Sequence, residues 1–321
     1  MRQLIGFTLR QVAVAAVTLV GIAVTVFVAM RLVPGSYADV LLGPRATPQL
    51  RAATTAQYGL DQPVTVQFTR WLGSLLRGDL GMSLSSGTPV ASEIIERAWL
   101  TLELALVAGL FTLVLGVVFG VLGGLTARRR TTAPTTRLIN AGLLSLPEIL
   151  IGALLVYLIS KYAVPFTIGV FPPFLEDPVG NLLAVIPPAA VVSTLGIGFV
   201  MATTRRSVAG VLQEPYVAAA RMRGVPQRTI YARHLWRNTA TPVVTVAGIY
   251  LAYLLGGVAI AEELFGLHGL GQYLIDSAAR RDYPAVQGVV LVAAAAFVVI
   301  NMVIDVLYGV IDPRVGRRAA T

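Results

Sequence analysis

The chain has 321 residues, of which 56% are hydrophobic and 13% charged, and its formal net charge is +9. Soluble domains are about a quarter charged, so this composition excludes an ordinary soluble protein and indicates one that lies mostly in lipid. Cysteine is absent, which excludes disulfides, thiolate metal ligands and a cysteine nucleophile. The arginines cluster between apolar segments, a pattern typical of membrane topology and not of nucleic acid binding.

Six apolar segments are long enough to cross a bilayer, because a helix needs about 20 apolar residues to cross about 30 Å of hydrocarbon. The candidate spans are 11–30, 100–126, 139–160, 183–203, 243–261 and 285–308. The first exceeds the apolar core of a signal peptide and no clear cleavage site comes after it, so we expect it to be retained. The sequence therefore predicts an all-α, polytopic membrane protein with six transmembrane helices.

The short connections differ in charge, and this difference predicts the orientation. Lys and Arg are absent from 162–182, whereas acidic residues dominate 262–284. Arginines are concentrated in two other connections and in the tail: Arg128, Arg129, Arg130 and Arg137; Arg205, Arg206, Arg221, Arg223, Arg228, Arg233 and Arg237; Arg314, Arg317 and Arg318. The positive-inside rule then places both termini and the 205–242 loop in the cytoplasm, and 32–99 outside.

A few charged residues fall inside or beside the spans. Glu103 and Glu262 are expected near the outer interface, where a carboxylate reaches water. Glu148 comes directly after Pro147, and the sequence leaves open an interfacial position or a cavity. Asp305 shares a helical face with Asn301, which fits either helix packing or a transport role. These residues do not form the continuous series of ionisable groups that a proton relay needs.

Glycine and proline mark further features of the spans. Gly116, Gly120 and Gly124 recur every four residues, a ridge of small side chains that permits close helix packing. Pro147 interrupts the third span, and Pro187 and Pro188 interrupt the fourth. Such broken helices can line a substrate path, but Pro187 and Pro188 are equally explained as the first turn of a span, where no amide donor is lost.

The chain shows no catalytic site or energy source of its own. It lacks the G-x-x-x-x-G-K-[ST] phosphate-binding loop. Its two histidines, His234 and His268, lie on opposite sides of the membrane in the predicted topology, so they cannot share a metal or an acid–base site. We therefore expect no enzymatic activity, and any driving energy has to come from a partner.

The 205–242 loop has the pattern of a rigid docking element. Residues 216–223 favour a short helix, with the small Ala219 and Ala220 permitting close approach of another surface. Gly224 can adopt the left-handed conformation that ends a helix. A second helix is expected to begin near Pro226 and to end at Pro242.

The extracytoplasmic segment 32–99 is too long for a simple turn. Its apolar positions include Val66, Phe68, Trp71, Leu72, Leu75 and Leu76. They predict an ordered, partly helical cap with an amphipathic piece around 63–77.

Nearly the whole chain resembles the dipeptide, oligopeptide and nickel branch of permease subunits from bacterial ABC importers. The matching blocks are RLVPG at 31–35, YGLDQPVTVQF at 58–68, GDLGMSLSSGTPV at 78–90, TLELA at 101–105, YVAAARMRG at 216–224, RHLWRNTATPVVT at 233–245, EELFGLHGLGQYL at 262–274, RDYPAVQGVV at 281–290 and NMVIDVLYGVIDPRV at 301–315. The resemblance implies a type I importer permease fold. It divides the chain into the N-terminus and first helix (1–31), the extracytoplasmic segment (32–99) and a five-helix core (100–321) with a cytoplasmic coupling loop (205–242).

The resemblance also implies functional residues. The ATPase-coupling residues would be Tyr216, Ala219, Ala220, Arg221, Arg223, Gly224, His234, Asn238 and Pro242. Gly78, Asp79 and Gly81 would contact a binding protein. Two departures from the family pattern stand out: Ala218 replaces an acidic residue that usually precedes the coupling motif, and PGSYAD, with Asp39, replaces the usual PGDP.

The expected partners are a second homologous permease in a heterodimer, two cytoplasmic ATPases, an extracytoplasmic solute-binding protein and the lipid bilayer, without nucleic acid. ATP and Mg would be held by the ATPases, with no cofactor in this chain. The implied function is ATP-driven import of di- or oligopeptides across a bacterial inner membrane. Nickel or another small solute is the alternative cargo; a self-sufficient secondary transporter or channel, or a membrane-bound enzyme, would be a different class.

Overall fold

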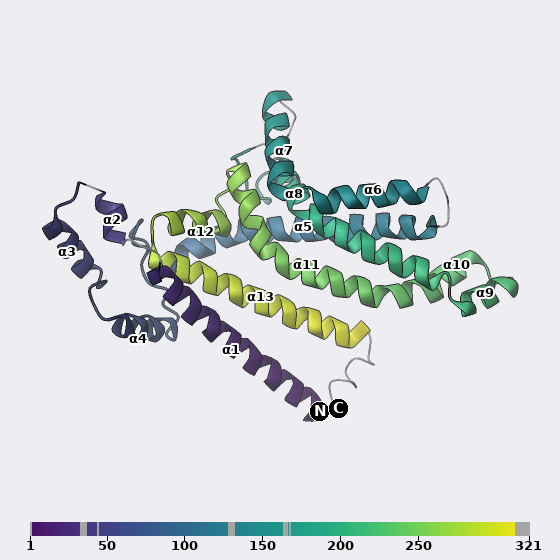
Figure 1. The fold of residues 1–321 in the computed structure, drawn as a ribbon, viewed down its shortest axis with the longest axis horizontal. Coiled ribbons are helices and arrows are strands. Elements are labelled where there is room, and N and C mark those ends of the chain that lie inside the picture. The colour runs from purple at the N-terminus through teal and green to yellow at the C-terminus, as the bar shows by residue number, and fades with distance from the viewer. Residues whose placement is uncertain are drawn as a thin grey trace. The chain divides into compact units, whose positions relative to one another are not determined.

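The protein is described by a computed structural model that covers residues 2–32, 37–43, 45–127, 132–162, 166 and 168–311. Within these ranges the regular structure is helical, apart from an isolated antiparallel bridge between Met82 and Pro89. The helices shown in Figure 1 are α1 (Arg2–Leu32), α2 (Tyr37–Leu42), α3 (Pro48–Gln57), α4 (Val64–Leu75), α5 (Val90–Leu125), α6 (Thr132–Ser145), α7 (Glu148–Tyr162), α8 (Pro178–Val211), α9 (Pro215–Met222), α10 (Gln227–Ile230), α11 (Trp236–Phe265), α12 (Leu270–Ala279) and α13 (Tyr283–Ile311). A π-helical turn, η1 (Tyr231–Leu235), joins α10 to α11.

The candidate membrane spans agree with the all-helical prediction but are less regular than the sequence suggests. Four helices are individually long and apolar enough to cross a bilayer: α1, α5, α8 and α13. Two further candidates are bent pairs: α6 and α7 meet at 93°, and the segments 238–251 and 256–265 of α11 meet at 55°. Among the described residues, the predicted six spans result when each bent pair is counted as one crossing.

The chain divides into two compact units. The first comprises Met1–Leu100 with His268–Val299, and the predicted extracytoplasmic segment 32–99 falls within it. There the predicted amphipathic piece around 63–77 forms α4. This helix packs on α1, where the Phe27 ring lies 4.9 Å from the Phe68 ring and 5.4 Å from the Trp71 ring. Arg31 stacks over Phe27 and donates to Gln67 at 2.8 Å.

The second unit comprises Thr101–Leu267 with Ile300–Thr321, and its centre is the packing of α5 and α11 on α8. The glycine ridge of α5 lies against α8. A Cβ atom would lie 2.7 Å from the Val200 Cβ at Gly116, and 2.5 Å from the Thr204 Cβ at Gly120. At Gly124 it would lie 2.5 Å from the Val208 Cβ. Side chains at these positions would force the two helices apart.

Pro187, Pro188 and Pro242 lie in the interior of helices, contrary to two sequence-based interpretations. Helix α8 begins at Pro178, capped by Asp177, so Pro187 and Pro188 are not in its first turn. Pro242 does not end the second helix of the coupling loop, because α11 continues through it. The helix continues despite the missing amide donor because Val243 and Ala247, in the turns after Pro242, pack against Val200 of α8. Neighbouring helices commonly stabilise prolines in membrane helices in this way.

Glu262, expected near water at the outer interface, is instead buried between helices, and Glu148, expected at the interface or in a cavity, is also largely buried. Glu262 is fully buried and accepts a hydrogen bond from Thr101 at 2.6 Å. Glu148 is 9% exposed and lies 3.5 Å from the hydroxyl of Tyr250, which donates its shorter bond, of 2.6 Å, to the carbonyl of Val192. Both carboxylates therefore contribute to helix packing inside the second unit. The side chain of Asp305 is outside the described part of the chain.

Candidate functional site: the coupling loop and its cleft

The coupling loop begins where α8 ends and consists of α9, a turn at Gly224, α10 and η1, which leads into α11. We call residues 214–235 the coupling knob. Pro215 occupies the first turn of α9, where no intrahelical donor is lost. Pro226 immediately precedes α10. The two short helices predicted from the sequence are therefore present, but the second continues into a membrane span.

Gly224 closes α9 in a left-handed conformation, with φ of +76°. Its amide donates to the carbonyl of Arg221 at 3.0 Å, and the amide of Val225 donates to that of Ala220 at 3.1 Å. This pair of bonds is the Schellman motif, which satisfies carbonyls at a helix end and reverses the chain. A Cβ at Gly224 would meet nothing within 4 Å. The requirement for glycine here therefore comes from the backbone angle and not from lack of space.

The interior of the coupling knob is apolar. Val217, Ala220 and Ile230 are buried together, and Val211, Val225 and Tyr231 pack around them. Ala220 is 3% exposed, so it faces this core and not a partner's surface, contrary to the sequence-based interpretation. Its small side chain lets α9 and α10 approach each other. Ala219 is only partly buried, and Ala218 is exposed.

The outer surface of the coupling knob carries larger side chains. Tyr216 is 41% exposed, and its hydroxyl accepts a hydrogen bond from the side-chain amide of Asn238 at 3.0 Å. This bond ties the start of α9 to the first turns of α11. Met222 is 83% exposed, and Arg223 is also exposed. His234 belongs to η1, and its side chain is outside the described part of the chain.

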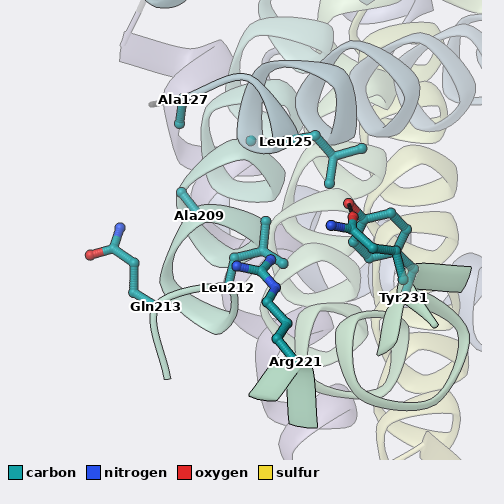
Figure 2. A pocket seen from close by; sticks show the side chains of 9 residues that line it. Leu125, Ala127, Ala209, Leu212, Gln213, Arg221 and Tyr231 are labelled. Atoms are coloured by element: carbon teal, nitrogen blue, oxygen red, sulfur yellow. Dashed lines mark hydrogen bonds between the residues drawn. The ribbon is translucent and has the colours of Figure 1, made fainter. Parts of the chain in front are cut away.

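A cleft of about 300 Å³ lies between the coupling knob and the ends of α5 and α8. Its lining residues are Gly124, Leu125, Ala127, Ala209, Leu212, Gln213, Arg221, Gln227 and Tyr231. In Figure 2 the Arg221 side chain extends toward Leu212, with Tyr231 to one side and Gln213 to the other. Arg221 and Arg223 are therefore in different surroundings, because only Arg221 lines the cleft.

A second set of predicted site residues lies in the first unit, before α5. Gly78 and Gly81 have φ of +78° and +84°, and the carboxylate of Asp79 accepts from the amide of Gly81 at 2.8 Å. The turn that they form leads into a short hairpin closed by the bridge between Met82 and Pro89. The GDLG motif thus shapes the backbone that presents residues 83–88.

Asp282 fixes this hairpin, a role that sequence reasoning missed. It is fully buried and accepts hydrogen bonds from the hydroxyl of Ser83 at 2.6 Å, and from the amide and hydroxyl of Ser85 at 2.9 and 2.8 Å. It also caps α13 by accepting from the amide of Ala285 at 3.2 Å. The available signal was an Asp placed two residues before Pro284, a common helix start.

Tyr273 belongs to the same polar cluster. Burial raises the pKa of its hydroxyl, and the nearby carboxylates of Asp282 and Glu93 raise that pKa further. The Arg97 guanidinium stacks over the Tyr273 ring at 4.7 Å and pairs with Glu93. Around the hairpin the first unit therefore holds an ordered polar cluster.

Comparison with known proteins supports the family assignment over nearly the full length. The family described as "Binding-protein-dependent transport system inner membrane component" matches residues 116–317, and its N-terminal part matches 4–105. A putative peptide transport system permease protein from Brucella abortus (strain 2308) is 35% identical, covering 96% of this chain and 98% of that protein. The dipeptide transport system permease protein DppB of Escherichia coli (strain K12) is 32% identical, covering 98% and 100%.

Among solved structures, an inward-facing MetNI methionine ABC transporter contains a chain with a TM-score of 0.51 and 24% identity. The match covers 68% of this chain and 96% of that one, and it concerns the fold. Together with the helical architecture, these matches show that the chain belongs to the family of binding-protein-dependent transport system inner membrane components, multi-pass membrane proteins that work with a separate ATPase and a binding protein.

Proposed function

We propose that this chain is one of two pore-forming permeases of an ATP-driven peptide importer. The support for peptides as the cargo is that relatives covering nearly the whole chain are described as peptide or dipeptide transport permeases. The support for ATP-driven coupling is the coupling knob, a compact two-helix element joined directly to the spans α8 and α11.

The single observation that carries the coupling role is the closed turn at Gly224. A separate motor subunit can move the spans only through a joint that does not deform under load. The Schellman bonds, the apolar core of Val217, Ala220 and Ile230, and the bond from Asn238 to Tyr216 each stiffen this joint. The exposed Tyr216, Met222 and Arg223 are the side chains that it offers to an ATPase.

The rest of the assembly is inferred from the family and remains part of the proposal. A second, homologous permease completes the pore as a heterodimer, two ATPases bind ATP and Mg on the cytoplasmic side, and this chain binds no cofactor. Both termini lie in the cytoplasm of a bacterial inner membrane. The hairpin at 83–88, positioned by Gly78, Asp79 and Gly81, contacts the solute-binding protein outside.

The alternatives differ in what drives uptake and in what is carried. Transport by the purified assembly in proteoliposomes should require ATP hydrolysis and the binding protein. Uptake of a labelled dipeptide driven by an ion gradient alone would identify a secondary transporter instead. ATP-dependent uptake of nickel or another small solute, without peptide uptake, would support the assignment as an importer and contradict the assignment of peptides as its cargo.

The orientation can be tested independently, because the chain has no native cysteine. In intact cells a cysteine at Gln227 should be protected from an impermeant thiol reagent, whereas one at Ser86 should react. Both positions are exposed in the chain itself, so protection would report the side of the membrane. External labelling at Gln227 would contradict the proposed topology.

A further inference from the structure

The cleft behind the coupling knob holds a cationic side chain that pairs with no described residue. The Arg221 guanidinium makes no hydrogen bond, ion pair or ring contact with the part of the chain that the structure describes. It nevertheless extends into the cleft beside Leu212 (Figure 2). A guanidinium presents several N–H donors in a planar fork that fits a phosphate or a carboxylate.

Among the lining residues that the structure describes, the other polar groups add donors and no negative charge. The hydroxyl of Tyr231 donates to the amide oxygen of Gln227, so the nitrogen of that amide is the group left to bind a ligand. Gln213 lies at the rim (Figure 2), and none of the nine lining residues is a carboxylate. This combination of one cation and neutral donors selects an anion.

The position of the cleft indicates where the anion comes from. The cleft is lined by the last residues of α5 and by the end of α8, the points at which these two apolar spans stop. A face of α5 that leads to Leu125 is apolar and exposed; its residues are Leu115, Val118, Phe119 and Leu122. Their spacing of three or four residues aligns them along one side of the helix. Acyl chains lying on this face would bring a lipid phosphate to the cleft.

We infer that the cleft behind the coupling knob binds the phosphate of an anionic phospholipid, with Arg221 as its counter-charge. The lipid would bridge α9 to the ends of α5 and α8, and so support the coupling knob from its membrane side. The two arginines of the coupling motif then have separate roles. Both side chains are exposed, but only Arg221 lines the cleft, so Arg221 faces the lipid and Arg223 is available to a protein partner.

The inference can be tested with the assembled transporter in nanodiscs of equal parts phosphatidylglycerol and phosphatidylethanolamine. Native mass spectrometry would measure phosphatidylglycerol retained on this subunit. Arg221→Gln should weaken retention about fivefold, the effect of one basic residue near an anionic lipid. The matched variant Arg223→Gln should retain the lipid as the wild type does. Arg221→Lys should keep part of the affinity, and Tyr231→Phe should lose less than Arg221→Gln.

Three results would overturn the inference. Equal losses in Arg221→Gln and Arg223→Gln would show general attraction to a basic surface. Unchanged lipid retention in Arg221→Gln, combined with weaker co-purification of the ATPase, would assign Arg221 to the protein interface. Displacement of the lipid by inorganic phosphate at the same concentration would leave a site for a soluble anion. Peptide uptake is measured separately, so a negative result for lipid binding would not change the assignment of the chain as an importer subunit.

Discussion

Two helix ends in this chain have the same backbone geometry but are stabilised by different chemistry. In the coupling knob, the left-handed residue that closes α9 is Gly224. In the other unit, the left-handed residue that closes α12 is Arg281, whose φ is +55°. There the backbone amide of Arg281 donates to the carbonyl of Ala278 at 3.2 Å, and the backbone amide of Asp282 donates to the carbonyl of Ser277 at 2.9 Å. Both ends are therefore Schellman motifs.

The two turns differ in the residue directly after the left-handed position. After Gly224 comes Val225, which packs on the apolar core of the coupling knob. After Arg281 comes Asp282, whose buried carboxylate holds the hairpin through Ser83 and Ser85. An apolar contact stabilises only its own turn, whereas the carboxylate connects segments far apart in the sequence. The first turn is thus a local unit, and the second depends on the surrounding fold.

The largest expected effect is on the apolar turn. Ala220→Glu places a charge in the core of Val217 and Ile230 without a partner, and should destabilise the coupling knob by about 3–5 kcal/mol. Ala218→Glu, two residues earlier on the exposed side, is the matched control and restores the acidic residue usual in the family. The midpoint of thermal unfolding and the amount of ATPase that co-purifies should fall in the Ala220→Glu variant only. Equal behaviour of the two would contradict the inward orientation of Ala220.

The polar turn should respond to loss of its carboxylate. Asp282→Ala removes the acceptor for Ser83, Ser85 and Ala285, and should destabilise the first unit by about 3 kcal/mol. Asp276→Ala is the control, because Asp276 is exposed on the neighbouring α12. Limited proteolysis should cut the 83–88 hairpin faster in the Asp282 variant. Wild-type resistance there would show that the hairpin is held by other contacts.

A smaller effect of opposite sign is expected at Arg281. A left-handed conformation costs a residue with a side chain about 1–2 kcal/mol relative to glycine, while glycine loses more entropy on folding. Arg281→Gly should therefore stabilise the protein by about 0.5 kcal/mol. A small rise in the thermal midpoint would support this account. A fall would show that the contacts of the Arg281 side chain exceed the backbone strain.

These two turns also show how far the sequence alone predicts the structure. The turn at Gly224 could be predicted because a glycine comes after a short helical pattern and two residues later a proline begins the next segment. The turn at Arg281 could not, because arginine carries no signal for a left-handed backbone. The link from Asp282 to Ser83 joins residues that are remote in sequence, and local patterns do not report such pairs.

The wrongly predicted positions have a common physical cause. Local propensity alone predicts that Pro242 ends a helix and that Ala220 faces a partner. In the structure, packing against α8 carries α11 through Pro242, and the pairing of α9 with α10 turns Ala220 inward. The six apolar segments were predictable from length and composition, and Pro147 marks the break between α6 and α7, but the 93° angle of that break was not predictable.

The central claim is that the turn at Gly224 transmits ATPase motion to the spans, and one ratio tests it most directly. Gly224→Ala strains the left-handed turn without a steric clash, whereas Gly210→Ala adds the same methyl group to open space in helical backbone of α8. Peptide uptake per ATP hydrolysed should fall several-fold in the reconstituted Gly224 variant and stay at the wild-type value in the Gly210 variant. Wild-type coupling in a fully assembled Gly224→Ala transporter would contradict the account.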